Sequence, residues 1–469
     1  MGTRTWSWLV VGVAMCLLFA GGCSDDGGQP GGGEDVGMDA GGDVAELDSG
    51  GDVGGDVEND VDPSSEVCDD GIDNDDDMDV DCRDEDCDGA AVCSFTQLDA
   101  GWVHACGVLE SGHVVCWGSN AGGRIGNGES ASEPVAPTVV EGLDGMVDVA
   151  VSLVHSCALS SDGTVHCWGN NEDGQLGDNS LVNSPFPVQV AELTDATAIS
   201  AGTYHTCAIT GEETGRRAYC WGGNFNNQAG VAVGEETKVP VRVTASSGTP
   251  LAGYTAISSG AVHTCAMKPS GGQGGHTVVC WGSNFGGQLG NGDMQSEHSV
   301  PMGSVRQKSD MAEIKDFVSG SLAAGENSTC AIRMDGSVWC WGDGSRGHFG
   351  SEALAEVQYA AVKYPGVGDA RRLWHGLYHV CAERASGRVV CWGDNDGLAF
   401  HDVLKVHYNP VLLHDLAEPN DVAPGGRLTC WADGDGGAYC QGASDSGQLG
   451  TPSLTQATSE PQRVYPEWQ

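Results

Sequence analysis

A short segment that recurs seven times constrains the fold of this 469-residue chain more than any other feature. Its clearest copy is residues 154–169, Val-His-Ser-Cys-Ala-Leu-Ser-Ser-Asp-Gly-Thr-Val-His-Cys-Trp-Gly. Each copy opens and closes on a cysteine, and successive opening cysteines are 49 to 65 residues apart. A period of this length and regularity is typical of stacked or ring-shaped repeat architectures. The sequence therefore predicts a repeat protein of this kind.

The residue pattern of each copy predicts two short strands joined by a tight turn. The strand positions carry Val, Ala, Leu, Tyr and Trp, which favour strands, and five copies carry Ser-Gly or Asp-Gly midway between the cysteines. Glycine there supplies the positive φ that a short hairpin loop needs. These turns are Ser111-Gly112, Asp162-Gly163, Asp335-Gly336, Ser386-Gly387 and Asp435-Gly436.

The two cysteines of a copy then lie opposite each other on adjacent antiparallel strands. Residues so placed have Cα atoms about 4.5–5.5 Å apart, which is within the window for a disulfide. Zinc is the alternative, but zinc sites favour close pairs such as Cys-x2-Cys, and the repeats have none. We therefore predict one disulfide in each repeat: Cys106–Cys116, Cys157–Cys167, Cys207–Cys220, Cys265–Cys280, Cys330–Cys340, Cys381–Cys391 and Cys430–Cys440.

Trp-Gly follows the second cysteine in six copies, and Gly-Gln-Leu-Gly or a variant follows a few residues later. The tryptophans are Trp117, Trp168, Trp221, Trp281, Trp341 and Trp392, with Gln441 at this place in the seventh copy. An asparagine follows at Asn120, Asn170, Asn224, Asn284 and Asn395. Over residues 95–469 this pattern resembles the regulator of chromosome condensation repeat family. The resemblance implies an all-β fold, a seven-bladed β-propeller with four-stranded blades.

Some copies depart from the family pattern. The fifth and seventh lose the histidine that precedes the first cysteine, at Ser328 and Leu428, and the sixth loses Gly-Gln-Leu-Gly around Gly397. The cysteines also distinguish the chain from intracellular members. Of 20 cysteines, fourteen lie in the repeats, four lie in residues 67–93, and Cys16 and Cys23 precede them. An even set with this spacing suits an oxidising compartment.

Repeated histidines and tryptophans could be either functional or structural. A ring of histidines at His104, His155, His205, His263 and His379 could bind metal or act as acids and bases, and the tryptophans could stack on sugars. A residue that recurs in every blade is more often part of the blade, and we favour that interpretation. No Ser-His-Asp set, zinc-protease motif, phosphate loop or dinucleotide fingerprint is present. We therefore expect no catalytic residue and no cofactor in the propeller.

The first 22 residues are predicted to be a processing segment. Arg4 precedes an apolar core at residues 9–19, which is too short for a membrane-spanning helix. Ala20-Gly21-Gly22-Cys23 resembles a bacterial lipobox, which implies cleavage before Cys23 and lipidation of its sulfur. Ser24 after the cysteine favours the outer membrane or the cell surface. The alternative is an ordinary signal peptide, with Cys23 unmodified.

Residues 23–66 are predicted to be a disordered acidic tether. They consist largely of Gly, Asp, Val and Glu and cannot bury enough apolar surface to order the chain. Residues 94–469 are acidic as well, with 40 acids and 19 bases. This charge argues against nucleic-acid binding and against adhesion to anionic lipid. Contact with a membrane is therefore expected through the lipid anchor only.

A small Asp- and Cys-rich module is predicted at residues 67–93. Carboxylates alternate along it, as calcium ligands often do, at Asp73, Asp75, Asp77, Asp79, Asp81 and Asp84. The module resembles an Asp-rich, Cys-rich metal-binding motif of secreted bacterial proteins, although Met78 stands where an EF-hand-type loop would have glycine. Calcium is the ligand it would take. The alternative is an extension of the tether held by two disulfides, whose pairing among Cys68, Cys82, Cys87 and Cys93 stays open.

The propeller of residues 94–469 is expected to work as a monomeric, non-enzymatic binding or scaffold protein. Longer spacings place insertions at residues 211–217, 271–276 and 302–316, where loops could contact a protein partner. The predicted location is the cell envelope, after export. Inhibition of a secreted or envelope enzyme is the alternative function. A glycan-active enzyme is a third and less favoured one.

Overall fold

The computed structural model describes residues 68, 87 and 90 and residues 92–466, apart from short gaps. The gaps are residues 132, 212–214, 232–235, 245–251, 272–273, 296, 299–303, 352–355, 402–404 and 452–455. The predicted processing segment, Cys23, the acidic tether and the six candidate calcium ligands lie outside the described residues. Their assignments stay predictions.

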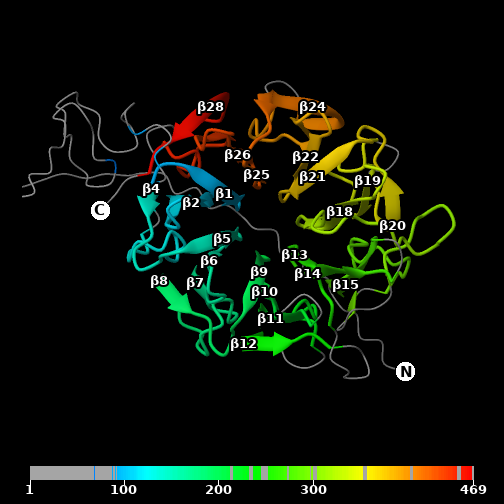
Figure 1. Ribbon diagram of the computed structural model, residues 1–469, viewed down its shortest axis with the longest axis horizontal. Coiled ribbons are helices and arrows are strands. Elements are labelled where there is room, and N and C mark those ends of the chain that lie inside the picture. Colours follow the sequence, from blue (N-terminus) through cyan, green and yellow to red (C-terminus); the bar gives the residue numbers. More distant parts are fainter. Residues whose placement is uncertain are drawn as a thin grey trace, which may run out of the picture. The chain divides into compact units, whose positions relative to one another are not determined.

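In the described residues, twenty-eight strands form seven four-stranded antiparallel sheets, each built from four consecutive strands. The sheets are arranged as blades around a common axis, and the elements assigned along the chain are all strands (Figure 1). The prediction of an all-β, seven-bladed propeller is therefore confirmed. Within each blade the strands are called A to D, from the innermost to the outermost.

The first four blades have the following strands. Blade 1 contains β1 (Phe95–Ala100), β2 (His104–Leu109), β3 (Val114–Ser119) and β4 (Pro134–Val139), and blade 2 contains β5 (Met146–Val151), β6 (His155–Ser160), β7 (Val165–Gly169) and β8 (Ser184–Gln189). Blade 3 contains β9 (Ala196–Ala201), β10 (His205–Thr210), β11 (Arg217–Gly223) and β12 (Glu236–Arg242), and blade 4 contains β13 (Ala256–Ser259), β14 (His263–Pro269), β15 (His276–Ser283) and β16 (Glu297–His298).

The last three blades complete the ring. Blade 5 contains β17 (Ala323–Ala324), β18 (Ser328–Ile332), β19 (Val338–Gly342) and β20 (Gln358–Lys363). Blade 6 contains β21 (Ala370–His375), β22 (His379–Arg384), β23 (Arg388–Asp394) and β24 (Val406–Ala417), and blade 7 contains β25 (Asp421–Pro424), β26 (Leu428–Ala432), β27 (Ala438–Gly442) and β28 (Thr458–Val464).

The recurring segment forms strands B and C, and a disulfide joins them in every blade. In blade 2, Cys157 lies directly opposite Cys167, and Gly163 makes the turn with a φ of 84°. The Cα atoms of the seven bridged pairs are 4.0–4.1 Å apart, which identifies non-hydrogen-bonded pairs. All fourteen cysteines are buried. The predicted disulfide in each repeat is therefore present.

The glycine of Trp-Gly makes a bulge at the end of strand C. Gly169 has a φ of 107°, and the register of β7 with β8 shifts between Cys167 and Gly169. A Cβ atom on Gly169 would lie 2.8 Å from the carbonyl oxygen of Val154. Glycine is needed here because positive φ and this close approach both exclude a side chain.

The ring closes by packing between whole blades, without exchange of a strand. Blades 1 and 7 share a core that includes Phe95, Trp117, Leu428 and Leu449, all buried. At the closure the backbone N–H of Leu98 also donates to Asp421 Oδ2, at 3.0 Å. The ends of the ring are therefore held together by apolar contact and hydrogen bonds.

The longest insertion folds into the ring. Residues 302–316 were predicted to be a surface loop, and residues 308–313 are indeed exposed, but Val305 and Ile314 are buried in the core shared by blades 4 and 5. Lys308 N–H donates to the carbonyl of Ala361, next to the outermost strand of blade 5. The described part of this segment, from Ser304 onward, is thus attached to blades 4 and 5 near both of its ends and exposed in between.

Candidate functional site

The repeated histidines join neighbouring blades. His155 Nε2 of blade 2 lies 2.8 Å from Thr206 Oγ1 of blade 3, and this hydroxyl donates to the carbonyl of Gln175 at 3.0 Å. Because the hydroxyl proton of Thr206 is used in that bond, the Thr206 oxygen can only accept from the imidazole. His155 therefore donates through its Nε2–H. Trp221 Nε1 donates to the same carbonyl at 2.8 Å. Histidine, threonine, tryptophan and the Gly-Gln-Leu-Gly backbone together form one interblade junction, which we call a seam.

The same elements recur around the ring. Imidazole–hydroxyl pairs at 2.7–2.9 Å are His104–Ser156, His205–Thr264, His263–Thr329 and His379–Thr429. Tryptophan donors at 2.8–3.1 Å reach the preceding blade from Trp117, Trp168, Trp281, Trp341 and Trp392. In blade 7 the amide of Gln441 takes the place of the indole and donates to the carbonyl of Leu398. These histidines and tryptophans are structural and fully buried.

Two seams lose both members of the imidazole–hydroxyl pair. Where blade 5 has Ser328, the facing position of blade 6 is Val380, and where blade 7 has Leu428, the facing position of blade 1 is Ala105. If only one member of the pair were lost, the remaining buried imidazole or hydroxyl would have an unsatisfied polar group. The paired loss was readable in the sequence and indicated that the two positions touch.

Burial keeps the seam histidines neutral. It lowers the pKa of His155, His205, His263 and His379 to about 3. A neutral imidazole can donate one hydrogen bond, which is the role seen in each seam. These residues are not placed to act as acids or bases on a ligand.

The conserved asparagine was assigned to the wrong residue in blade 2. Asn171 Oδ1 accepts the backbone N–H five residues later, from Leu176, and Asn120, Asn224, Asn284 and Asn395 make the same bond in their own blades. Asn170 lies one position earlier and does not fill this place. In the other copies that have it, this asparagine is the third residue after the tryptophan, and the third residue after Trp168 is Asn171, in agreement with the loop hydrogen bond.

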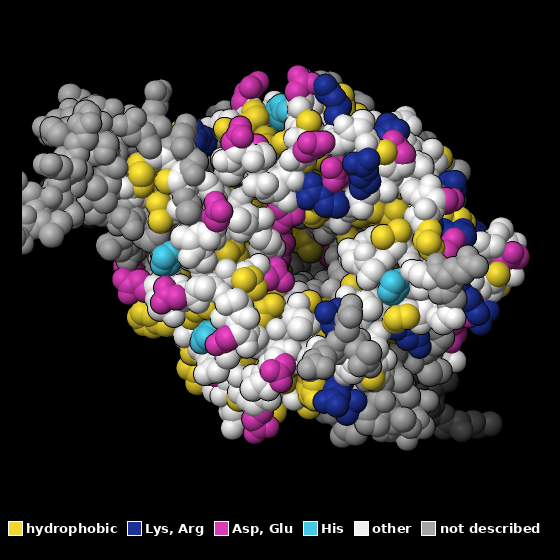
Figure 2. Space-filling view, in the orientation of Figure 1, with side chains coloured by type: hydrophobic (Ala, Val, Ile, Leu, Met, Phe, Trp, Pro, Cys, Tyr) yellow, Lys and Arg dark blue, Asp and Glu magenta, His cyan; other side chains and the backbone are white. Residues whose placement is uncertain are grey.

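A cavity of about 430 Å³ occupies the centre of the ring. The innermost strands of the blades line it, and it is visible as a hollow with acidic side chains on the side of β1 and β5 (Figure 2). Three carboxylates from neighbouring blades line the cavity: Asp421, Asp99 and Asp148. The other blades contribute small residues at many of the inward positions, among them Ser200, Ser258 and Ala323.

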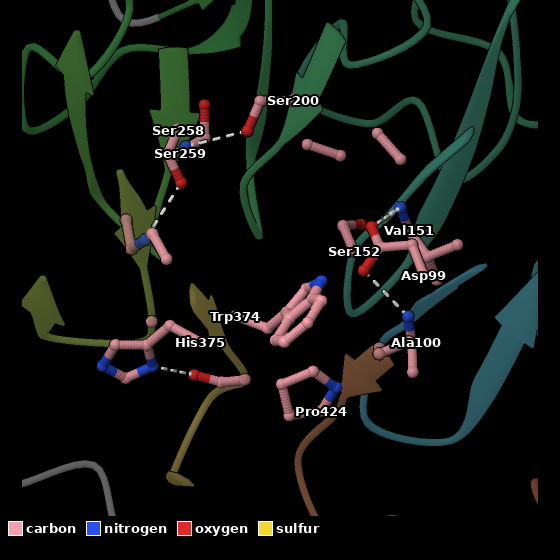
Figure 3. A pocket seen from close by; sticks show the side chains of 18 of the residues that line it. Asp99, Ala100, Val151, Ser152, Ser200, Ser258, Ser259, Trp374, His375 and Pro424 are labelled. Carbon is pink, nitrogen blue, oxygen red and sulfur yellow. Dashed lines mark hydrogen bonds between the residues drawn. The ribbon is translucent and has the colours of Figure 1, made fainter. Parts of the chain in front are cut away.

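Inward side chains join the innermost strands to one another. Asp99 Oδ2 accepts the N–H of Val151 at 2.7 Å, and Ser200 Oγ accepts the N–H of Ser259 at 2.8 Å (Figure 3). In each case the acceptor is on one blade and the donor is on the next. An innermost strand has an unpaired edge, so these side chains satisfy backbone groups that the sheet leaves free.

The three carboxyl groups are harder to ionise than usual. Burial raises the pKa of Asp99 to about 7 and that of Asp148 to about 8, and the pKa of Asp421 is raised as well. Repulsion between the carboxylates adds to the shift of Asp148. The aspartates therefore join neighbouring inner strands and also form an acidic wall of the cavity.

Trp374 is the aromatic residue of this wall. Its indole lies toward the middle of the cavity, between Asp99 and His375, where the equivalent residues of the other blades are small or acidic (Figure 3). Nε1 donates to Asp421 Oδ1 at 2.7 Å, and the guanidinium of Arg372 lies 5.0 Å from the ring centroid. Sequence reasoning missed Trp374 and the three aspartates. The available signal was that Trp374 and Asp99 each differ from the residues at the same place in the other blades, and that an aspartate recurs at one inner-strand place in only two blades, as Asp148 and Asp421.

The remaining sequence predictions concern residues largely outside the described part of the chain. Within it, no group of three or more His, Cys, Asp or Glu side chains is placed to hold a metal ion. The open pairing in the acidic module is answered for one bridge, Cys68–Cys87. The described residues also include no helix long and apolar enough to cross a membrane.

Two repeat models match the propeller. Both describe the regulator of chromosome condensation (RCC1) repeat. One matches residues 111–159 and 162–209, and the other matches residues 95–124, 146–175, 196–228 and 321–347. The repeats and the propeller expected from the resemblance are therefore present.

Curated relatives are similar over about two thirds of the chain. The ultraviolet-B receptor UVR8 of Arabidopsis thaliana is 28% identical over 314 residues, which cover 65% of this chain and 66% of the receptor. The probable E3 ubiquitin-protein ligase HERC6 of Homo sapiens is 27% identical over 312 residues, which cover 65% of this chain but 29% of the ligase. The chain thus spans less than two thirds of the length of each of these relatives.

Solved structures share the fold at low identity. Human WBSCR16 superposes with a TM-score of 0.63 at 19% identity, covering 75% of this chain and 94% of that protein. Prp20p of Saccharomyces cerevisiae, described with its binding to Gsp1p and histones, gives 0.60 at 20% identity, covering 72% and 82%. At this identity the likeness establishes the architecture alone.

Proposed function

We propose that the chain is an exported, non-enzymatic binding module, held in the cell envelope by a lipid on Cys23, that recognises a protein through one face of its propeller. In a four-stranded meander the A–B and C–D loops lie at the same end of the blade, and we call the surface they form the loop face. Backbone bonds such as Gly223 N–H to the carbonyl of Tyr204 tie the two loops together in each blade.

The observation that carries the proposal is that repeated and unrepeated residues occupy different parts of the propeller. The repeated histidines, tryptophans and cysteines are buried in seams and hairpins, where they make the ring rigid. Many of the residues that differ between blades lie in the loops, and a smaller set, which includes Trp374 and Asp99, lines the central cavity. A rigid frame that presents variable loops is the arrangement used for recognition, because little ordering entropy is lost on binding.

The relatives are consistent with this function. The names of UVR8 and of the Prp20p structure describe a receptor and a protein that binds Gsp1p and histones. HERC6 is named as a ligase, but this chain matches only 29% of it. We carry over binding as the general role and none of these partners, because an exported protein would not meet them.

The test is site-specific photo-cross-linking of the full chain in its native envelope. Probes placed singly in loop-face loops should cross-link a defined protein, whereas probes in the B–C turns on the opposite face, such as Ser161, should not. If both faces or neither face cross-link, the proposal fails. Stoichiometric loss of the partner's activity on binding would show the chain to be an inhibitor.

Membrane attachment is tested separately. Cys23→Ala should release the exported protein from membranes, because a single acyl chain or none binds only marginally. Retention of the variant in the membrane fraction would contradict lipid anchoring.

Calcium binding by residues 67–93 is tested by titrating the full chain with calcium in a calorimeter. The double variant Asp77→Asn with Asp79→Asn should abolish the heat.

A glycan ligand is a second candidate, favoured by the indole of Trp374 beside carboxylates in the central cavity. A tryptophan face with nearby hydrogen-bonding groups suits a sugar ring. Calorimetry with a panel of oligosaccharides should then give heat that Trp374→Ala removes. Absence of heat for the whole panel at millimolar concentration would rule out this candidate.

A further inference from the structure

The loop face of blades 3 and 4 exposes four large apolar side chains. Tyr204, Phe225, Phe285 and Met294 are 37%, 48%, 69% and 77% exposed, and we call them the aromatic strip. Tyr204 lies in an A–B loop and the other three lie in C–D loops. The rings of Tyr204 and Phe225 meet edge to face, with centroids 5.0 Å apart.

The elements that carry the strip meet across the seam between blades 3 and 4. A Cβ atom on Gly282, at the end of β15, would lie 3.2 Å from the Cα of Gln228, so the loop that carries Phe225 packs against the strand that leads to Phe285. The two loops also have the same conformation. Asn224 and Asn284 each accept the N–H of the residue five positions later, which places the two phenylalanines equivalently.

Blade architecture does not require these aromatic residues. The position of Phe225 and Phe285 is occupied by small or polar residues in the other blades, namely Ala121, Glu172, Ser345, Asp396 and Asp445. Gly223 supports the aromatic pair, because its missing side chain lets Phe225 Cε1 approach to 3.1 Å of where a Cβ atom would be. Exposed aromatic residues without a packing role mark interaction surfaces.

Carboxylates outnumber cationic groups near the strip, where Lys238 of β12 and Arg306 pack beside Gly174 and Gly292 of these loops. The described residues of the A–B and C–D loops of blades 2 to 4 include no lysine or arginine, but they include Glu172, Asp173, Asp178 and Asp293. Glu172 and Asp173 lie in the loop of Gln175, whose Cα is 3.3 Å from where a Cβ atom on Gly222 would be, beside the aromatic pair. Partial burial, and then the carboxylates of Glu236 and Glu172, raise the pKa of Asp173.

We propose that the aromatic strip is the docking site for a protein segment whose apolar side chains are flanked by lysine or arginine. This inference rests on the proposed function and specifies its surface and the chemistry of its partner. Charge complementarity selects this occupant: the chain carries a net charge of −45, so a second copy or its own acidic tether would be repelled. A basic segment would bury the rings and neutralise the flanking carboxylates.

The first experiment measures binding of a fluorescent leucine–lysine amphipathic peptide to the full chain by anisotropy. Phe285→Ser should weaken binding at least about tenfold, as expected for an interface hot spot. Leu412→Ser is the matched control, because Leu412 is 48% exposed on β24 of another blade. Every variant keeps the acidic tether, so peptide bound there contributes equally.

Charge is tested with a second matched pair. Glu172→Lys, beside the strip, should weaken peptide binding, and this effect should shrink as salt is raised. Glu141→Lys makes the same change in net charge in the segment between blades 1 and 2 and should have little effect. A leucine–glutamate peptide should not bind. Equal losses in Phe285→Ser and Leu412→Ser, or equal binding of the two peptides, would overturn the proposal.

Cross-linking in the native envelope separates this inference from the proposed function. A photo-reactive residue at position 285 should capture a segment containing lysine or arginine beside apolar residues, and one at position 412 should not. Capture elsewhere on the loop face but not at position 285 would leave the proposed function standing and reject the strip. Capture of a second copy of this chain would also reject it.

Discussion

The imidazole Nε2 of His375, on blade 6, lies 3.0 Å from the hydroxyl of Ser328 on blade 5. Ser328 stands where most blades have their own seam histidine. A Cβ atom on Gly325 would lie 2.3 Å from Cε1 of His375, and in blade 4 a Cβ atom on Gly260 would lie 2.2 Å from Cε1 of His263. The ring from blade 6 therefore occupies the place of the histidine that blade 5 lacks.

Restoring that histidine alone should destabilise the protein. In Ser328→His two imidazoles would compete for one buried space, and overpacking of a core costs about 1–3 kcal/mol. Adding His375→Ala and Val380→Thr should recover most of the loss, because the repeat's own pair is then complete. Urea unfolding at pH 7 measures both. A triple variant no more stable than the single one would contradict this account.

The imidazole–hydroxyl pair in a seam should behave as one unit. His205→Leu and Thr264→Ala each leave a buried polar group unsatisfied, so each should cost about 1–3 kcal/mol. The double variant imitates the apolar pair Leu428 and Ala105 and should cost less than the sum of the two. A double-mutant cycle from urea unfolding measures the coupling. Strict additivity would show that the 2.7 Å contact contributes nothing.

Each hairpin disulfide should stabilise the fold appreciably. Cys157 and Cys167 are ten residues apart, and closing a loop of this length is worth about 3 kcal/mol in the chain-entropy model. The variant Cys157→Ala with Cys167→Ala should unfold at a correspondingly lower urea concentration while keeping native circular dichroism. A loss below about 1 kcal/mol would mean that blade packing already imposes the restraint.

Acid should unfold the protein through the seams. The pKa of His205 is about 3 in the folded chain but about 6.5 when unfolded, so the unfolded state binds more protons below pH 6.5. Stability from this residue is present above pH 6.5 and is lost as the pH falls, by about 1.4 kcal/mol per pH unit. Between pH 6 and 4.5, His205→Gln should show a shallower decline than the parent. An identical slope would contradict this.

The cavity carboxyls should act in the opposite direction. The pKa of Asp148 is raised to about 8, so between about pH 4 and 8 the folded state binds more protons than the unfolded state. Stability therefore falls as the pH rises through this window. From pH 6.5 to 8.5, where the seam histidines are neutral, Asp148→Asn should flatten the decline in urea midpoint. The decline would persist unchanged if Asp148 were ionised throughout.

Much of the fold was predictable because the repeat is a local signal. The turn at Asp162-Gly163, the cysteines on either side and the glycine after Trp168 are close in sequence, and their spacing dictates a hairpin. The one misassigned residue, Asn170 for Asn171, was an error of alignment, because the asparagine is the third residue after the tryptophan in the other copies that have it. The bond that Asn171 accepts from the N–H of Leu176 agrees with that spacing.

The candidate surfaces were not predictable, for a physical reason. Phe225 and Phe285 are 60 positions apart in the chain, and whether a phenylalanine directly after this asparagine is buried or exposed depends on the loop that surrounds it. The insertion at residues 302–316 was predicted to lie on the surface, which holds for residues 308–313 but not for two of its apolar residues. Its apolar residues Val305 and Ile314 could have been exposed, but blades 4 and 5 bury them.

The hairpin, its disulfide, the number of blades and the acidic character of the chain could be read directly from the amino-acid sequence, since each follows from neighbouring residues or from composition. How the blades meet could be learned from the tertiary structure alone. In the folded protein, each seam histidine binds a hydroxyl of the next blade, and the imidazole of His375 takes the place of the histidine that blade 5 lacks. Asp421, Asp99 and Asp148 come together on one wall of the cavity. Contacts between blades depend on positions about 50 residues or more apart, and closing the ring is what brings those positions together.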